Sequence, residues 1–160
     1  MLGTRDKKLE SLGYPLDRVP PIGAIYKPVV VDGTTVYTSG SVAVDGTVLT
    51  VKGPVPSKVS LEDAKRAAAL CAANILRNVR NHVGSLDRIA RVMKTIGYVY
   101  SDPDFHEHHL VINGASELMR EVFGEDGVGT RTAFGVAALP LGSSVEIDVI
   151  LQLKPEFASR

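Results

Sequence analysis

The spacing of hydrophobic and polar residues predicts two strands near the end of the 160-residue chain. Residues 145–153 alternate between apolar and polar side chains, which is typical of a strand with one buried face. Glu146 and Asp148 occupy its polar face. Residues 131–138 are almost all apolar, which predicts a strand that is covered on both sides. The short connection at 139–144 favours neighbouring positions for these two strands.

Two longer segments have helical rather than alternating periodicity. The first begins with the Ser60-x-x-Asp63 start signal and runs to about His82, before Gly84. The second covers about residues 107–123. The apolar stripe of the first helix is Ala64, Ala67, Ala68, Cys71, Ile75, Leu76 and Val79, and that of the second is Leu110, Val111, Ala115, Leu118, Met119 and Val122. The many alanines of the first helix indicate that it packs closely against a sheet.

The N-terminal half predicts a short helix over residues 4–13, followed by hairpins. A first strand over 24–31 contains Tyr26, and the Asp32-Gly33 turn leads into a returning strand over 34–39. A shorter hairpin is expected over 41–51 and a further strand over 88–100. Antiparallel strands with two inserted helices predict an α+β fold, with the helices on one face of one sheet. We expect one domain over residues 1–160, in which 1–22 form an N-terminal extension with a short helix.

Composition excludes several classes of function. Lysine plus arginine equals aspartate plus glutamate, so no basic excess favours nucleic-acid binding. One cysteine cannot form an intramolecular disulfide. No apolar run approaches the ~20 residues of a membrane span, and the charged N-terminus is unlike a secretory signal. We therefore expect a cytoplasmic protein without a membrane partner.

Most familiar catalytic motifs are missing from the sequence. There is no Gly-x-Ser-x-Gly elbow, no Gly-x-Gly-x-x-Gly after a strand and no Walker loop. Cys71 lies on an apolar helix stripe, where cysteine usually acts as a small hydrophobic residue. His106 and His109 would share a helix face and could bind a metal, but no third ligand can be identified, so a solvated helix end is favoured.

Arg131 stands at the start of an apolar strand and needs an anion if it is buried. One interpretation is a salt bridge to Glu146 or Asp148 across neighbouring strands. The other is a bidentate clamp on the carboxylate of a ligand. The residues alone leave both interpretations open.

Several motifs, in this order, resemble the RidA/YjgF family, also called the endoribonuclease L-PSP family. They are Tyr37-Thr-Ser-Gly40, the alanine-rich helix with Asn74-Ile-Leu76, Gly84-Ser-Leu-Asp-Arg88, Thr130-Arg-Thr-Ala-Phe-Gly-Val-Ala-Ala-Leu-Pro140 and Val145-Glu-Ile-Asp148. The segments Asn113-Gly-Ala-Ser-Glu-Leu118 and Val122-Phe-Gly-Glu125 are similar to one divergent branch. The resemblance covers residues 23–153.

The resemblance implies a chorismate-mutase-like fold and a homotrimer with three clefts between subunits. It also implies hydrolysis of reactive enamines and imines, such as 2-aminoacrylate, to 2-keto acids and ammonia, without a metal or organic cofactor. Arg131 matches the arginine that binds the substrate carboxylate, Glu146 the glutamate that places water, and Gly40 the glycine whose carbonyl faces the substrate nitrogen. Further substrate-binding residues would be Tyr26, Ser39 and, for the family's helix asparagine, Asn113 or Ser116. Ala133 stands where the family often has cysteine.

Two other functions stay open at this point. A non-catalytic protein that binds small keto or imino acids would use the same trimeric clefts and need Arg131 but not Glu146. The family's older label suggests an endoribonuclease, which the balanced charge disfavours.

Overall fold

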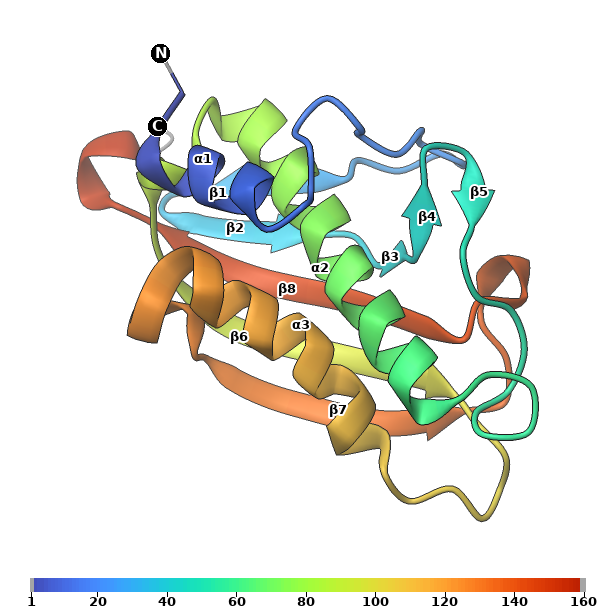
Figure 1. Cartoon of the computed structure of the whole chain (residues 1–160). Coiled ribbons are helices and arrows are strands. Elements are labelled where there is room, and N and C mark those ends of the chain that lie inside the picture. The colour runs from blue at the N-terminus through green and yellow to red at the C-terminus, as the bar shows by residue number, and fades with distance from the viewer. Residues whose placement is uncertain (1, 159–160) are drawn as a thin grey trace.

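The computed structural model describes residues 2–158. Three helices lie on one face of a mixed sheet, so the predicted α+β architecture is confirmed (Figure 1). The helices are α1 (Thr4–Ser11), α2 (Leu61–Val83) and α3 (His108–Phe123). The strands are β1 (Val29–Asp32), β2 (Thr35–Thr38), β3 (Ser41–Val42), β4 (Val44–Asp45), β5 (Val48–Leu49), β6 (Ile89–Tyr100), β7 (Thr130–Val136) and β8 (Val145–Leu153). Within the described residues, no helix combines the length and apolar composition that crossing a membrane requires.

The main sheet has the strand order β1-β2-β8-β6-β7, and β3 also pairs with β8. All of its pairs are antiparallel except β6 with β7, which are parallel. The prediction that residues 131–138 and 145–153 form neighbouring strands is therefore wrong, because β6 lies between them. The chain runs from β6 through α3 to β7, and a helical crossover of this kind joins parallel strands.

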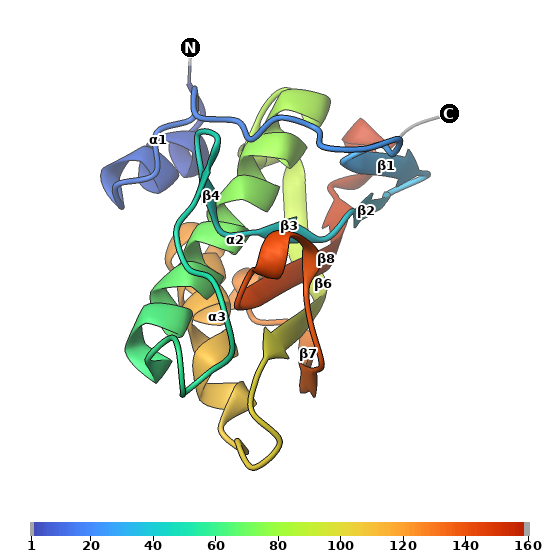
Figure 2. The same cartoon turned by 90° about the vertical axis from the view of Figure 1, so that its right-hand side faces the viewer.

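The core lies between α2, α3 and the facing side of β8 and β6, as the edge-on view shows (Figure 2). Val145, Ile147 and Val149 are buried on this side, as their alternation predicts. The edge strand β7 differs from its prediction. Most of its residues are exposed rather than covered on both sides.

The predicted first strand begins later than expected. Residues 24–26 form bends, and pairing with β2 starts only at Val29. Pro28 explains this limit, because proline cannot donate a ladder hydrogen bond. Tyr26 consequently belongs to the N-terminal arm, by which we mean residues 12–28 between α1 and β1.

The helix α1 is fastened to the turn before β6 by two aspartates. Asp87 accepts hydrogen bonds from the backbone N–H groups of Thr4 (2.7 Å) and Arg5 (2.9 Å). Asp6 is buried and accepts from the Leu86 N–H (2.9 Å) and the Ser85 hydroxyl (2.9 Å). Carboxylates at a helix start satisfy amides that have no partner within the helix. The predicted short helix is therefore part of the packed structure.

The contact between α2 and α3 depends on Gly114. A Cβ atom at this position would overlap the backbone carbonyl of Lys65 on α2. We expect Gly114→Ala to destabilise the fold by about 1–3 kcal/mol, because helix separation outweighs the ~1 kcal/mol gain in helix propensity. Urea unfolding measures the difference in the free energy of unfolding between the variant and the natural protein.

Glu117→Ala is the matched control on the same helix. It removes an exposed ion pair with the Lys65 side chain (2.9 Å) and should change stability by less than about 1 kcal/mol. Equal stability of Gly114→Ala and the natural sequence would refute the close helix contact.

Candidate functional site

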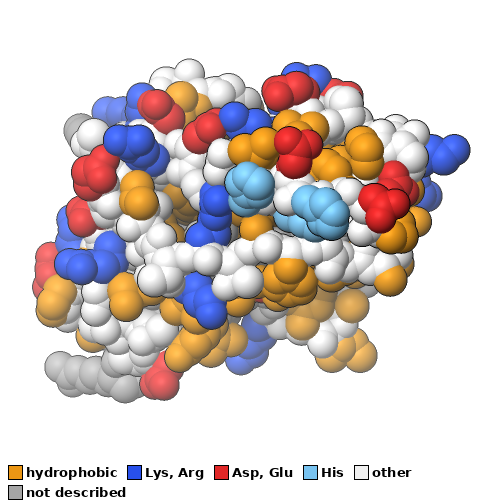
Figure 3. Space-filling view, turned by 90° about the horizontal axis from the view of Figure 1, so that it is seen from below, with side chains coloured by type: hydrophobic (Ala, Val, Ile, Leu, Met, Phe, Trp, Pro, Cys, Tyr) orange, Lys and Arg blue, Asp and Glu red, His pale blue; other side chains and the backbone are white. Residues whose placement is uncertain are grey.

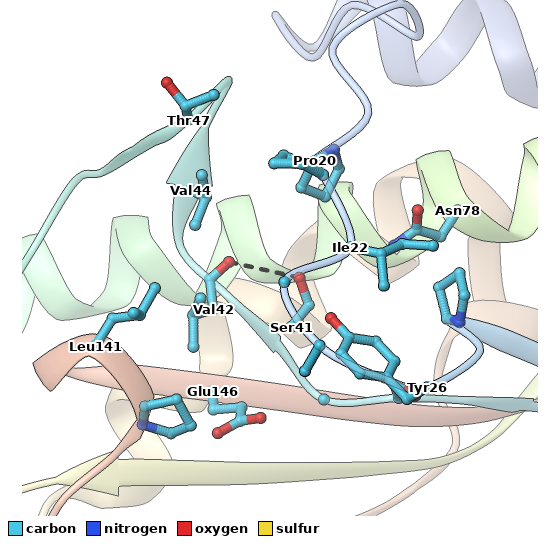
Figure 4. Close-up of a pocket in the computed structure, with 17 residues that line it drawn as sticks. Pro20, Ile22, Tyr26, Ser41, Val42, Val44, Thr47, Asn78, Leu141 and Glu146 are labelled. Atoms are coloured by element: carbon cyan, nitrogen blue, oxygen red, sulfur yellow. Dashed lines mark hydrogen bonds between the residues drawn. The ribbon is translucent and has the colours of Figure 1, made fainter.

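A cavity of about 500 Å³ lies between the N-terminal arm, the β3–β4 segment and the start of β8 (Figure 4). Its lining includes four of the predicted site residues, namely Tyr26, Ser39, Gly40 and Glu146. They come from the arm, the β2–β3 connection and β8, which are far apart in sequence. The structure thus brings these four residues to one cavity.

Glu146 is oriented by the alternation of β8. Val145 and Ile147 on either side of it are buried beneath the helices, so the carboxylate projects from the opposite face of the sheet. Gly40 stands directly over it: a Cβ atom at Gly40 would overlap Glu146 Oε1. This close approach is possible only because position 40 has no side chain.

The electrostatic environment makes Glu146 a weaker acid than usual. Burial raises the pKa of the Glu146 carboxyl, and the negative charge of Asp148 raises it further. Asp148 itself accepts a hydrogen bond from the Tyr98 hydroxyl (2.8 Å), and burial together with this bond raises the pKa of Tyr98 to about 12. A carboxylate with a raised pKa is a better proton acceptor, which suits a general base.

Ser39 and Tyr26 have different surroundings within this cavity. The Ser39 hydroxyl donates a hydrogen bond to the Lys27 carbonyl (2.7 Å), so it ties the arm to the end of β2. Tyr26 is about half exposed and has no regular strand around it. Tyr26 can therefore contact a ligand from the arm side of the cavity.

The other predicted residues form a second cluster at β7 and α3. Arg131 Nη1 donates to Asn113 Oδ1 (2.8 Å) and Ser116 Oγ (3.2 Å). Arg131 Nη2 donates to the His109 carbonyl (3.4 Å). We name these residues the arginine cluster: Arg131, Asn113, Ser116 and His109. Both helix residues that could replace the family's asparagine thus contact the arginine.

Among the described residues, only neutral oxygen atoms accept hydrogen bonds from the Arg131 guanidinium. Within residues 2–158, no carboxylate lies within ion-pair distance of it. The side chain is exposed, so no buried charge needs neutralising. The face below α3 and β7 displays histidine and basic side chains near its middle (Figure 3). The predicted alternative of a salt bridge to Glu146 or Asp148 is therefore wrong, and the arginine is available to an anion.

The two clusters lie on opposite faces of the sheet within one chain. Arg131 contacts α3 on the helix side of β7, whereas Glu146 projects from the other side of β8. Strand β6 separates them, with Thr95 paired to Arg131 and Tyr98 paired to Glu146. One ligand cannot touch both groups in an isolated chain.

Sequence reasoning missed a buried polar pair on α2. Arg77 and Asn74 are 1% and 0% exposed, and Arg77 Nη1 donates to Asn74 Oδ1 (2.7 Å). Asn74 Nδ2 then donates to the Val44 carbonyl (2.8 Å), while Arg77 Nε donates to the Pro15 carbonyl (2.8 Å). Asn74 and Arg77 are three residues apart beside the apolar stripe of the helix, and this spacing could have indicated that their side chains contact each other.

The histidine segment does not form the predicted helical pair. Helix α3 begins at His108, so His106 lies before it, and the assumed i, i+3 geometry is wrong. His108 Nε2 forms a hydrogen bond with the Ser101 hydroxyl (2.9 Å). The described residues contain no group of three or more histidine, cysteine or carboxylate side chains placed to hold a metal ion.

Cys71 is a core residue. It is fully buried, its Sγ donates to the Val145 carbonyl (3.7 Å), and burial raises the pKa of the thiol well above its usual value. A thiol in this state is a poor nucleophile. The structure agrees with its interpretation as a small hydrophobic residue.

The charge of Asp148 should control the titration of Glu146. We expect Asp148→Asn to lower the pKa of Glu146, because the substitution removes a negative charge that disfavours ionisation. Carbon-13 NMR of labelled glutamate side chains measures the midpoint.

Asp104→Asn removes a charge of the same sign from the turn before α3, outside this cavity, and serves as the control. If Glu146 titrates at the same pH in the natural protein, in Asp148→Asn and in Asp104→Asn, the charge of Asp148 does not influence the pKa of Glu146.

Known proteins resemble this chain over almost its full length. The sequence profile of the family described as "YjgF/chorismate_mutase-like, putative endoribonuclease" matches residues 6–153. Protein TCP17 of Trypanosoma cruzi is 34% identical over 146 residues, which are 91% of each chain.

Solved structures show that the fold of this chain is also similar to that of known proteins. Protein Atu1372 of Agrobacterium tumefaciens, of unknown function, is 41% identical, with a TM-score of 0.85 over 93% of this chain and 91% of that one. RidA from the Antarctic bacterium Psychrobacter sp. PAMC 21119 is 28% identical, with a TM-score of 0.60 over 86% of this chain and 95% of that one. With its chorismate-mutase-like fold, the chain belongs to the YjgF/RidA family.

Proposed function

We propose that this protein is a deaminase that hydrolyses reactive 2-imino acids and their enamine forms, such as 2-aminoacrylate, to 2-keto acids and ammonia. Membership of the YjgF/RidA family supports the class of reaction. The observation that carries the proposal is that the Arg131 side chain is oriented but not neutralised. Its guanidinium is held in place by neutral oxygens, so its charge is available for a substrate carboxylate.

The proposed active site joins the two clusters from adjacent subunits of a homotrimer. Because Arg131 and Glu146 lie on opposite faces of one sheet, a shared ligand requires a second copy of the chain. The sheet face opposite the helices also exposes Val30 (46%), Tyr37 (47%) and Phe134 (40%). Apolar side chains gathered on an open sheet face favour association with another surface.

Each group then has a distinct chemical task. Arg131 binds the carboxylate of the substrate and fixes the orientation of the imine carbon. The Gly40 carbonyl accepts a hydrogen bond from the protonated imine nitrogen, which favours the more electrophilic iminium. Glu146, with its raised pKa, accepts a proton from the attacking water.

The hydrolysis balances without a redox step. The water oxygen forms a bond to the imine carbon, and the electron pair of the C=N π bond moves to nitrogen. Glu146 returns the proton to the nitrogen, the C–N bond breaks, and ammonia leaves. The carbonyl group of the 2-keto acid forms as the remaining hydroxyl loses its proton.

The family's ribonuclease label finds less support in the cavity. Its lining contains Glu146 and no lysine or arginine. Nucleic-acid sites need an excess of positive charge against phosphates, and Glu146 together with Arg131 of an adjacent subunit would supply no net positive charge.

Removal of the arginine tests the proposal. We expect Arg131→Ala to lower kcat/KM for enzymatically generated 2-aminoacrylate by about 100-fold or more, because the carboxylate loses its charged, bidentate partner. Ammonia release above the uncatalysed rate is the measurement. Arg120→Ala, which removes an exposed arginine paired with Glu125 at 3.0 Å, should leave the rate unchanged.

Glu146→Gln separates catalysis from binding. It should abolish hydrolysis yet leave the affinity for pyruvate largely intact in calorimetry. If the natural protein binds pyruvate but releases no ammonia above background, a non-catalytic binder replaces the deaminase. Catalysis unaffected by Arg131→Ala would reject the assigned site.

Mixing of inactive subunits tests the shared cleft. Arg131→Ala and Glu146→Gln proteins, unfolded together in equal amounts and refolded, should regain about a quarter of the natural activity, because that share of clefts receives both intact residues. Each variant refolded alone should stay inactive. Failure of the mixture to regain activity, with trimers confirmed by sedimentation, would place both residues of each site in one chain.

A further inference from the structure

The buried pair of Arg77 and Asn74 on α2 lies directly behind the wall of the cavity. Neither side chain lines the cavity, but Asn78, one residue after Arg77 on the same helix, does. Within residues 2–158, no carboxylate lies within ion-pair distance of Arg77, and its hydrogen-bond acceptors are neutral oxygens. A buried charge without a counterion lowers stability, and an apolar side chain would avoid that cost. Core packing alone therefore does not account for the pair.

The first contact of the pair orients an amide. Arg77 Nη1 donates to Asn74 Oδ1 (2.7 Å). Because a guanidinium has donors and no acceptor, it holds the amide oxygen toward itself and turns the amide NH₂ group away. Both residues are at most 1% exposed, so water does not compete for this hydrogen bond. Arg77 thus makes the Asn74 NH₂ group a fixed donor.

The amide nitrogen of Asn74 holds the β3–β4 segment. Nδ2 donates to the Val44 carbonyl (2.8 Å) and, over a longer distance, to the Val42 carbonyl (3.4 Å). In an extended segment, groups two residues apart point in the same direction, so one NH₂ group can reach both carbonyls. Strand β3 pairs with β8 over only two residues, and so short a ladder is a weak attachment by itself. The buried amide therefore supplies a second attachment for this segment.

The β3–β4 segment in turn places two groups of the proposed active site. Val42 is paired with Glu146 across β3 and β8, and Gly40 lies two residues before Val42. A Cβ atom at Gly40 would overlap Glu146 Oε1, so the backbone at Gly40 is already very close to the carboxylate. Val42 and Val44 lie on the segment that passes Glu146 (Figure 4). A shift of this segment would change the distance between the Gly40 carbonyl and Glu146.

The second contact of Arg77 fastens the N-terminal arm. Arg77 Nε donates to the Pro15 carbonyl (2.8 Å). The arm is also joined to β4 by the ion pair of Arg18 and Asp45 (3.0 Å), but this pair is exposed and contributes little. The arm carries Tyr26, which lines the cavity. One buried guanidinium thus connects the two segments that lie on either side of the cavity.

We propose that Arg77 and Asn74 act as a positioning pair for the hydrolysis. The pair sets the distance between the Gly40 carbonyl and the Glu146 carboxylate, and neither of its residues touches the substrate. The inference rests on the proposed deaminase function and adds two residues to it. Misplacement of a reacting group by about 1 Å can lower a rate by about 100-fold. Binding of the substrate carboxylate is separate, because Arg131 lies in the arginine cluster on the other face of the sheet.

Carbon-13 NMR of the Glu146 side chain tests the pair without a substrate. Asn74→Leu has a similar volume but no donor, so the β3–β4 segment should withdraw from β8 and admit water. Because burial is the main cause of the raised Glu146 pKa, the pKa should fall toward its ordinary value. The titratable groups that interact with Glu146 are unchanged in this variant; they are Asp148 on β8, Tyr98 on β6 and Cys71 on α2.

Turnover supplies the second measurement. Asn74→Leu and Arg77→Met should each lower kcat for enzymatically generated 2-aminoacrylate by about 10- to 100-fold, while the affinity for pyruvate in calorimetry stays within about twofold. Arg77→Lys keeps a charge and donors, so its kcat should be higher than that of Arg77→Met. Sedimentation verifies that each variant keeps the assembly state of the natural protein. Equal kcat values for Arg77→Lys and Arg77→Met would overturn the role of the Arg77 donors.

Val122→Ala is the control for a general loss of stability. Val122 is buried on α3, away from the β3–β4 segment. The substitution should lower the urea midpoint of unfolding and leave both the Glu146 pKa and kcat unchanged. If Val122→Ala shifts the Glu146 pKa as much as Asn74→Leu does, general loosening explains the effect and the positioning pair is rejected.

Asn74→Ser covers the case in which Asn74→Leu does not fold. It is a smaller change that keeps one donor, and it should lower the Glu146 pKa in the same direction. An unchanged pKa in the folded variant, whether Asn74→Leu or Asn74→Ser, would overturn the proposal.

The positioning pair and the deaminase fail in different ways. If the natural protein releases no ammonia above background, the deaminase fails, and the NMR titration still decides whether the pair positions Glu146. If Asn74→Leu and Arg77→Met turn over 2-aminoacrylate as fast as the natural protein, the positioning pair is rejected and the deaminase stands.

Discussion

The alternation of β8 is the constraint on which the rest of the structure depends. Its inward residues are buried on the helix side of the sheet, where α2 packs on the strand, and its outward residues include Glu146 and Asp148. A shift of one residue would exchange the two sets, which would expose valine and isoleucine while burying two carboxylates. The burial of apolar side chains therefore fixes where the Glu146 carboxylate points. Core packing and site geometry are set by the same nine residues.

Separation of charge is the second organising property. The guanidinium of Arg131 is oriented on the helix face, and the carboxylate of Glu146 is oriented on the other face. A direct ion pair between them would neutralise the arginine and hold the glutamate in its ionised form. The intervening strand β6 prevents this within one chain. Arg131 thereby keeps a positive charge that an anionic substrate could use, and Glu146 keeps a raised pKa that would let it accept a proton from water.

Features that depend on local sequence were predictable. Helical periodicity located α2 and α3 to within about one residue, and Gly84 marks the end of α2. The faces of β8 followed from its alternation. The resemblance to known motifs indicated Tyr26, Ser39, Gly40 and Glu146, which do line one cavity.

Features that depend on distant contacts were not predictable in the same way. The short loop between β7 and β8 suggested direct pairing, yet α3 joins β6 to β7 as a parallel crossover and places β6 between them. The apolar sequence of β7 suggested burial on both sides, although most of it is exposed in one chain. The Arg77–Asn74 pair was missed because its acceptors lie more than 25 residues away.

The buried Arg77 has a consequence for how the chain can be divided. Residues 1–22 precede the sequence motifs that resemble the family and look like a removable extension, although the family profile already matches from residue 6. Yet the Pro15 carbonyl is the acceptor for a guanidinium that is 1% exposed, and Asp6 supplies the acceptor for the Leu86 amide. A shortened chain would remove one of the two hydrogen-bond acceptors of this guanidinium and leave Asn74 Oδ1 as the other. In energetic terms, the domain begins with the helix at residue 4, and any comparison of relatives that omits this segment omits one wall of the cavity.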